Sequence, residues 1–220
     1  MSTLAAYQRA MVSLAFAEDD ARPHIPGFEL YRDMIRARLF AMAKVAYERS
    51  FDAHCFARYL ADRPPASPFI REVIAGFGPY AEREASGLRV SLLRFETAKW
   101  QVASLPYPAS EAGELDFEAR LVVNPTLLRV PLEHVVTEDE RAEAHILLVY
   151  RRPDDHGVLW SRLPRVAALL ADEAPKQKLS ERVAAYFARG VDTADEAGLT
   201  RLADELMLAV ERGIVLGTEL

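Results

Sequence analysis

The sequence predicts an α+β protein, with an all-helical N-terminal domain over residues 1–108 and a small, winged-helix-like α+β domain over 109–220. The first reason is periodicity: apolar residues recur at three- and four-residue steps through the first half, whereas alternating, β-branched segments appear only after Pro106 and Pro108. The second reason is size. The chain has 220 residues, of which 50% are hydrophobic, so each domain can bury a core.

Runs rich in proline and glycine divide the first half into five expected helices. The clearest break is the run RPPASP at 63–68. Within it, Ser67 can cap the next helix and Pro68 can occupy its first turn, and Gly78 with the proline after it can interrupt or bend that helix. The expected helices cover residues 3–17, 28–48, 52–60, 68–84 and 88–102.

The second half changes from a helical period to a strand period after the acidic linker ASEAGELD at 109–116. Pro131 lacks an N–H group and therefore confines its strand to a sheet edge or a bend. Expected strands cover 117–123, 127–136 and 143–152, followed by a turn at 154–157. Expected helices then cover 158–172, 179–189 and 195–212, with Ser180 capping the second of them and a short strand at 214–216.

Helical spacing also predicts which side chains face a core. The helix at 52–60 directs Phe56, Tyr59 and Leu60 inward. The helix at 195–212 presents one apolar side, formed by Leu199, Leu202, Leu206 and Val210. We therefore expect each helix to pack against the rest of its domain through this apolar side.

The distribution of charge argues against a nucleic-acid binder. Residues 1–110 carry 14 basic and 12 acidic residues, a balance of +2, whereas residues 111–220 carry 13 and 21, a balance of −8. Phosphate contacts dominate nucleic-acid affinity, so a binder normally has a basic face. No stretch approaches the ~20 apolar residues of a membrane span, and Cys55 is the single cysteine. We therefore expect a cytoplasmic protein in a reducing compartment, without a membrane partner.

A search for catalytic patterns gives no set of reacting residues. The histidines have no metal-ligand spacing, and no glycine-rich phosphate loop is present. His54 and Cys55 point about 100° apart on a helix, so they cannot easily act as base and nucleophile. His134 and His145 lie on expected strands and could face each other. An enzyme that uses Cys55 or this histidine pair is the weakest hypothesis, and a binding protein is favoured.

Two features could bind a partner. Arg32, Arg36 and Arg38, joined by Arg49, could form a basic face for phosphates or carboxylates, although a solvated helix face, partly neutralised by Glu29 and Asp33, is the favoured explanation. The strand HILLVYRR could offer an open edge to an extended peptide, or lie covered inside the sheet. The candidate peptide-binding residues on and after this strand are His145, Leu147, Val149, Arg151 and Arg152.

The first half resembles the methanobactin-biosynthesis partner protein family, whose members often carry a DNA-binding-domain label. The matching segments are FELYRDMIRARLFAMAKVAYERSF (28–51), HCFARYLADRPPASPFIREVIAGFGPYAE (54–82) and SLLRFETAKWQV (91–102). The family pattern is an early Tyr-Arg, an aromatic-x-x-Tyr helix with a Pro-Pro-x-Ser turn, and a later helix with an acidic residue followed by a tryptophan. Those positions are here Tyr31-Arg32, then Phe56, Tyr59, Pro64, Pro65 and Ser67, then Phe95, Glu96 and Trp100. In the second half, the strand segments LVVNP (121–125) and YRR (150–152) occur in the same order as in the family, but their sequence match is looser.

This resemblance implies a non-catalytic subunit that pairs with an iron-dependent oxygenase of TIM-barrel type. Such a subunit helps the oxygenase recognise a ribosomal precursor peptide, whose cysteines become oxazolone and thioamide in methanobactin. The iron would be held by the partner chain, so no cofactor is expected in this one. Candidate partner-interface residues are Tyr31, Arg32, Arg36 and Trp100. The alternative is a DNA-binding transcriptional regulator that uses a winged-helix-like second domain.

Overall fold

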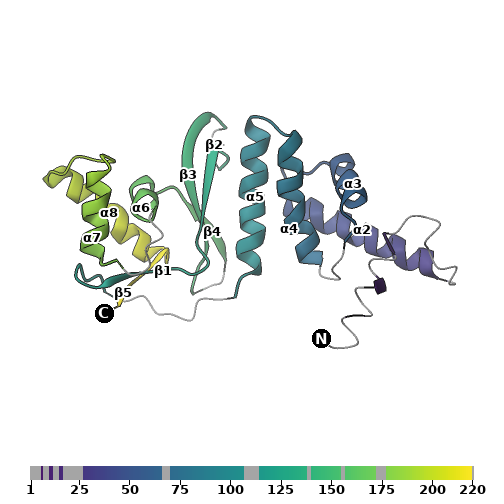
Figure 1. The fold of residues 1–220 in the computed structure, drawn as a ribbon, viewed down its shortest axis with the longest axis horizontal. Helices are drawn as coiled ribbons and strands as arrows, with labels where there is room; N and C mark the ends of the chain where they lie inside the picture. The colour runs from purple at the N-terminus through teal and green to yellow at the C-terminus, as the bar shows by residue number, and fades with distance from the viewer. Residues whose placement is uncertain are drawn as a thin grey trace. The chain divides into compact units, whose positions relative to one another are not determined.

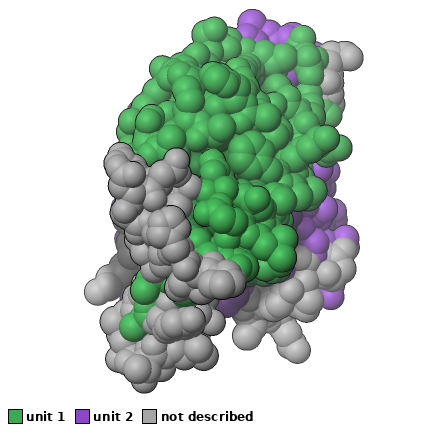
Figure 2. Space-filling view, turned by 90° about the vertical axis from the view of Figure 1, so that its right-hand side faces the viewer, with its two compact units in different colours: residues 1–100, 136–140 green, residues 101–135, 141–220 purple. Residues whose placement is uncertain are grey.

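The protein forms two compact units in a computed structural model (Figures 1 and 2). The structure describes residues 27–65, 70–106, 114–137, 140–154, 157–171 and 177–219, and also residues 6, 10, 11, 15 and 16. Unit 1 comprises residues 1–100 and 136–140, and unit 2 comprises 101–135 and 141–220. Helices combine with small antiparallel sheets, so the α+β prediction is confirmed.

Within the described residues, unit 1 has four helices and one 3-10 turn. They are α2 (Phe28–Ala46), α3 (Ala53–Asp62), α4 (Ile70–Ala81), η2 (Glu82–Glu84) and α5 (Leu88–Ser104). The expected helices at 28–48, 52–60, 68–84 and 88–102 are confirmed within a few residues at their ends. The expected helix at 3–17 and the Ser67 cap lie largely or wholly outside the described residues.

Helix α4 continues through a proline that was expected to interrupt or bend it. It runs from Ile70 to Ala81 with Pro79 inside, two residues before its end. The expected interruption is therefore absent, and the alternative of a bend stays a prediction. Pro79 removes one N–H donor from the helix ladder, and because it lies in the last turn, only two helical residues follow it.

Aromatic side chains fill the core of unit 1. Phe56, Tyr59 and Leu60 of α3 are all buried, as their helical spacing predicted. The rings of Phe56 and Phe77 meet edge-to-face, with centroids 5.0 Å apart. Such pairs stabilise a core beyond the area that they bury, so this contact helps to fix α3 against α4.

In unit 2, the described part of the chain forms two antiparallel sheets and three helices. The strands are β1 (Arg120–Val123), β2 (Leu128–His134), β3 (Ala142–Arg151), β4 (Val158–Ser161) and β5 (Val215–Glu219). One sheet has the order β2-β3-β4, and the other pairs β1 with β5. The helices are α6 (Pro164–Leu169), α7 (Leu179–Ala188) and α8 (Glu196–Glu211).

Strand β4 corrects the expectation of a helix over 158–172. Val158–Ser161 form a strand paired with the end of β3, and the helix α6 starts only at Pro164. The reason is that the short apolar run VLWS fits either state, and its pairing with β3 decides between them. Ser180 is likewise not a cap, because α7 begins at Leu179 and follows Lys178.

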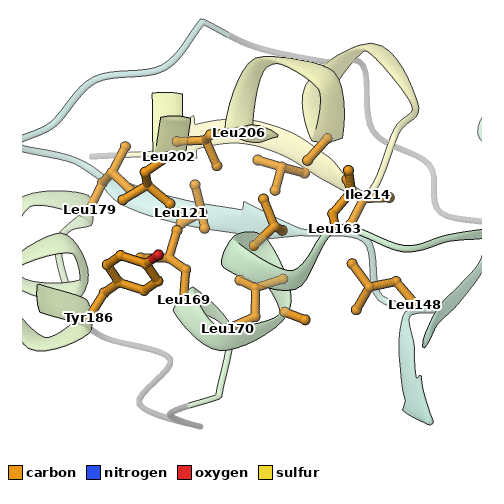
Figure 3. Packing of buried hydrophobic residues seen from close by; sticks show 14 of the residues in the cluster. Leu121, Leu148, Leu163, Leu169, Leu170, Leu179, Tyr186, Leu202, Leu206 and Ile214 are labelled. Atoms are coloured by element: carbon orange, nitrogen blue, oxygen red, sulfur yellow. The ribbon is translucent and has the colours of Figure 1, made fainter. Parts of the chain in front are cut away.

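The core of unit 2 joins side chains of the three helices with side chains of β1, β3 and β5 (Figure 3). Leu148 and Tyr150 of β3 share this core with Leu169 of α6, and with Leu202 and Leu206 of α8. The expected inward position of Leu199 is wrong, because its side chain is 49% exposed. Leu199 lies at the margin of the buried side of α8, and not among the central residues of that side.

Candidate functional site

The β2-β3-β4 sheet is the candidate site, because peptide capture was predicted at one of its edges. Pro131 lies on β2 opposite Ile146 of β3, and β2 is an outer strand of the sheet, so the edge prediction for the proline strand is confirmed. A proline cannot donate a hydrogen bond to an added strand. The β2 side of the sheet is therefore the less suitable side for pairing with a peptide.

The opposite side of the sheet ends on the short strand β4. Its residues pair with β3 only from Leu148 to Arg151. Among the strands that the structure describes, none pairs with residues 142–147 of β3 on that side, nor with the outer side of β4. We call this stepped border, residues 158–161 together with 142–147, the β4 edge.

Trp160 lies on β4, within the β4 edge. Its side chain is 42% exposed, although its main chain pairs with Val149 in the middle of the sheet. Arg162, directly after β4, forms an ion pair with Glu143 at the start of β3. The β4 edge therefore combines main-chain groups, one large aromatic ring and an ion pair.

The candidate peptide-binding residues lie mostly on the central strand and not at an edge. His145, Leu147, Val149 and Arg151 alternate along β3 and therefore share one face. Leu147 is only 1% exposed and Val149 is 0% exposed, so a ligand cannot contact these two side chains. The Nδ1 atom of His145 is 2.9 Å from the carbonyl oxygen of Glu143, and burial lowers the pKa of this imidazole, assisted by Arg141.

The two candidate arginines hold the chain at the end of β3. Arg151 donates from Nη1 to the carbonyl oxygen of Leu105 at 2.6 Å. Arg152, just after the strand, donates its main-chain N–H to Gly157 and pairs with the carboxylate of Asp154 at 2.9 Å. These contacts close the connection from β3 to β4.

Asn124 organises the same region and was not among the predicted site residues. Its buried Nδ2 group donates to the carbonyl oxygens of Arg151 and Gly213, both at 2.7 Å. Its Oδ1 atom accepts the Thr126 hydroxyl at 2.7 Å, and that hydroxyl oxygen in turn accepts the N–H of Arg151 at 2.9 Å. The sequence signal was the Asn-Pro dipeptide, which marks a turn. Asn124 thus fixes the end of β3, from which the β4 edge is built.

The candidate partner-interface residues come from two helices of unit 1. On α2, Arg32 pairs with Glu29 at 2.6 Å and with Asp33 at 3.2 Å, whereas Arg36 is exposed. Tyr31 is half-buried on the same helix. Trp100 lies on α5, and its indole N–H donates to the carbonyl oxygen of Arg71 on α4 at 3.2 Å.

Two further residues from the sequence patterns have contacts within unit 1. Arg49 pairs with Glu140 and also donates to the carbonyl oxygen of Val136. Glu96 is buried and accepts the N–H of Arg49 at 2.9 Å and the hydroxyl of Ser50. Helix α5 therefore secures the segment after α2 through Glu96, which explains an acidic residue in the core.

The groups considered for catalysis do not converge. His134 pairs with Ala142 and His145 pairs with Leu132, so the prediction that these histidines could face each other is wrong. Burial raises the pKa of the Cys55 thiol. Within the described ranges, no cluster of three or more His, Cys, Asp or Glu side chains could hold a metal ion. The described helices also include none with the length and apolar character to cross a membrane.

No protein-family model matches this chain, and no curated protein matches it.

Proposed function

We propose that this chain is a non-catalytic recognition subunit, which binds a ribosomal precursor peptide at the β4 edge and pairs with a TIM-barrel iron oxygenase. The observation that carries the proposal is the border formed by β4 and residues 142–147 of β3, where no described strand pairs with the sheet. An extended peptide can add to such a border through main-chain hydrogen bonds. The proposal that the partner is an oxygenase rests on the family resemblance of the first half. In this proposal the partner chain holds the iron, and both chains act in the cytoplasm.

The half-exposed ring of Trp160 gives this edge a means of selecting side chains. Main-chain pairing provides affinity for any extended segment, whereas side-chain contacts discriminate between segments. Large aromatic residues often act as anchors in protein interfaces, because they bury much area at a low cost in conformational entropy. Trp160 is therefore the residue whose truncation should weaken peptide binding most.

Peptide binding can be tested with a short cysteine-containing peptide, chosen by searching the neighbouring genes for one. We expect the labelled peptide to raise its fluorescence anisotropy on titration with the chain, and Trp160→Ala to weaken binding at least about tenfold. Phe117→Ala is the matched control, because Phe117 is a 55% exposed aromatic residue of unit 2 outside the sheet. Equal affinities for the wild type and Trp160→Ala would contradict a role for the β4 edge.

Partner binding can be tested by co-expression with a TIM-barrel iron oxygenase, chosen by searching the neighbouring genes for one. We expect the two chains to elute together at micromolar concentration, with iron in the oxygenase. Arg36→Glu should weaken the complex, because Arg36 is exposed and has no ion pair among the described residues, so its charge is available to a partner. Separate elution of the wild-type chains would count against the pairing.

A DNA-binding regulator with a winged-helix-like second domain is the alternative, and the charges of its helices do not favour it. Such a domain needs a basic helix for phosphate contacts. Helix α8 carries four acidic residues and one arginine, and α7 carries one of each sign. Gel shifts with genomic DNA at two salt concentrations decide this, because phosphate-driven binding weakens steeply as salt rises.

A further inference from the structure

Arginines gather at the end of β4, beside the β4 edge. Arg162 directly follows β4 and forms an ion pair with Glu143 of β3, and Nε of Arg141 lies 2.8 Å from the other oxygen of that carboxylate. On the last residue of β4, the hydroxyl oxygen of Ser161 accepts from Nη1 of Arg212 at 2.9 Å, directly after α8. Three guanidinium groups from separate segments therefore lie at the end of this strand. We call these three arginines the arginine end of the β4 edge.

The positive charge of the arginine end is only partly compensated. Glu143 is the one carboxylate that the described contacts bring to it, and Arg141 and Arg162 share that carboxylate. Arg212 is exposed and has no ion pair among the residues that the structure describes. A guanidinium group donates several hydrogen bonds in one plane, which suits a carboxylate. The arginine end can therefore bind acidic side chains of a ligand.

This local excess of positive charge contrasts with the composition of the second half. Residues 111–220 carry 13 basic and 21 acidic residues, a balance of −8. An acidic peptide is therefore repelled by the average charge of this half and attracted at the arginine end, which favours one position and register. A nucleic acid has a phosphate at every nucleotide and would need basic groups along its whole contact. The charge pattern therefore favours a short acidic segment of a peptide.

The geometry of strand pairing relates the arginine end to Trp160. In a strand added to β4, one residue lies opposite Trp160, and the next two lie opposite Ser161 and Arg162. Because Ser161 carries the contact with Arg212, both of these positions are next to a guanidinium group. Main-chain pairing can therefore place an apolar residue beside the ring of Trp160 and acidic residues one and two positions away from it.

We propose that the β4 edge captures an acidic peptide segment, in which an apolar residue opposite Trp160 is adjoined at the next two positions by aspartate or glutamate. This inference rests on the proposed function, because it requires an extended peptide to add to β4 as a strand. It narrows the ligand from any extended segment to an acidic one. The arginine end determines specificity, whereas main-chain pairing provides the affinity that all extended segments share.

The test compares two fluorescein-labelled synthetic peptides of about twelve residues, rich in threonine around a central leucine. One carries two aspartates on each side of the leucine, so that either strand direction places carboxylates at the arginine end, and the other carries asparagines instead. With the full chain at low salt, fluorescence anisotropy should show at least about fivefold tighter binding of the aspartate peptide, since each exposed charge pair contributes modestly and two act together. About 0.5 M salt should remove most of the difference.

The double variant R162Q/R212Q removes the charge of the arginine end but keeps side chains that can donate a hydrogen bond. It should weaken binding of the aspartate peptide at least about fivefold more than binding of the asparagine peptide, whereas a collapsed edge would weaken both equally. R120Q/K178Q is the matched control in unit 2. Both of its side chains are exposed and lie outside the β2-β3-β4 sheet, and Lys178, like Arg162, is paired with a glutamate. This control should retain the wild-type preference.

The outcomes separate this inference from the function on which it rests. Equal binding of both peptides, weakened by Trp160→Ala, would overturn the inference and leave strand capture at the β4 edge standing. Binding of neither peptide would overturn both. A preference that persists in R162Q/R212Q would overturn the role of the arginine end. So would an unlabelled single-stranded oligonucleotide that displaces the aspartate peptide as well as unlabelled peptide does, because the site would then bind anions in general.

Discussion

The phenol of Tyr47 is inserted into the main-chain ladder of α4 beside Gly78. Its hydroxyl accepts the N–H of Gly78 at 3.1 Å and donates to the carbonyl oxygen of Ile74 at 2.9 Å. In an ordinary α-helix those two main-chain groups would bond to each other. Burial raises the pKa of Tyr47 to about 12, so the hydroxyl stays protonated and able to donate. The packing of α2 against α4 thus depends on one side-chain oxygen.

Removing that oxygen should destabilise unit 1. Tyr47→Phe leaves the carbonyl of Ile74 and the N–H of Gly78 without their partner in a buried site, which costs about 1–3 kcal/mol. Urea unfolding followed by circular dichroism measures the loss. Tyr31→Phe is the control, because Tyr31 is only half-buried on the same helix. Equal stability of the two variants would contradict the role given to Tyr47.

Gly78 should not tolerate even a methyl group. A Cβ atom built there would lie 1.9 Å from Oγ1 of Thr97, a buried side chain of α5. Although alanine normally stabilises a helix, overpacking should prevail and Gly78→Ala should lose about 2–3 kcal/mol. Adding Thr97→Ala removes the obstructing oxygen, so the double variant should be more stable than the sum of the single effects. Strict additivity in urea unfolding would show that the clash is not the cause.

Asn124→Asp tests the junction at the end of β3. The substitution keeps the shape but replaces an amide donor with an acceptor facing the carbonyl oxygens of Arg151 and Gly213. We expect a loss of at least about 2 kcal/mol, because a buried group would lose its partners and meet like charge. Peptide affinity should fall with it, since the β4 edge is built from the end of β3. Thermal unfolding and the anisotropy titration give the two readouts, and a variant with wild-type values in both would refute this role.

The ion cluster around Asp192 should make unit 2 sensitive to acid. Arg201 and then Arg165 hold the pKa of the Asp192 carboxyl well below its ordinary value of 3.8. The unfolded chain therefore binds this proton more readily, so the stabilisation is complete above that value and is lost as the pH falls below it. Between about pH 6 and about pH 3, the urea midpoint should fall more for the wild type than for Asp192→Asn. Identical slopes in the two proteins would exclude this linkage.

Several elements could be predicted because their signals are local. The inward positions of Phe56, Tyr59 and Leu60 follow from helical spacing. The main-chain groups of a helix form hydrogen bonds with one another, so only the side that faces the core has to be predicted, and the spacing of apolar residues identifies it. The outer position of the β2 strand follows from Pro131, which lacks the N–H that an inner strand must donate.

The candidate site was harder to predict, because its contacts join distant segments. The strand 143–152 was correctly expected, but its central place in the sheet depends on β4, whose own sequence fits a helix equally well. Asn124 contacts Gly213, which lies 89 positions further along the chain. No local pattern could have identified that pair of carbonyl oxygens as its partners.

The sequence by itself therefore determined the α+β class, most of the helices, and the strand that a proline keeps at the border of the sheet. Tertiary structure alone decided that Leu147 and Val149 are covered and that Trp160 is not. The physical reason is that a helix forms hydrogen bonds with its own neighbours along the chain. The position of a strand, in contrast, depends on which other segment of the chain provides the partners for its main-chain hydrogen bonds.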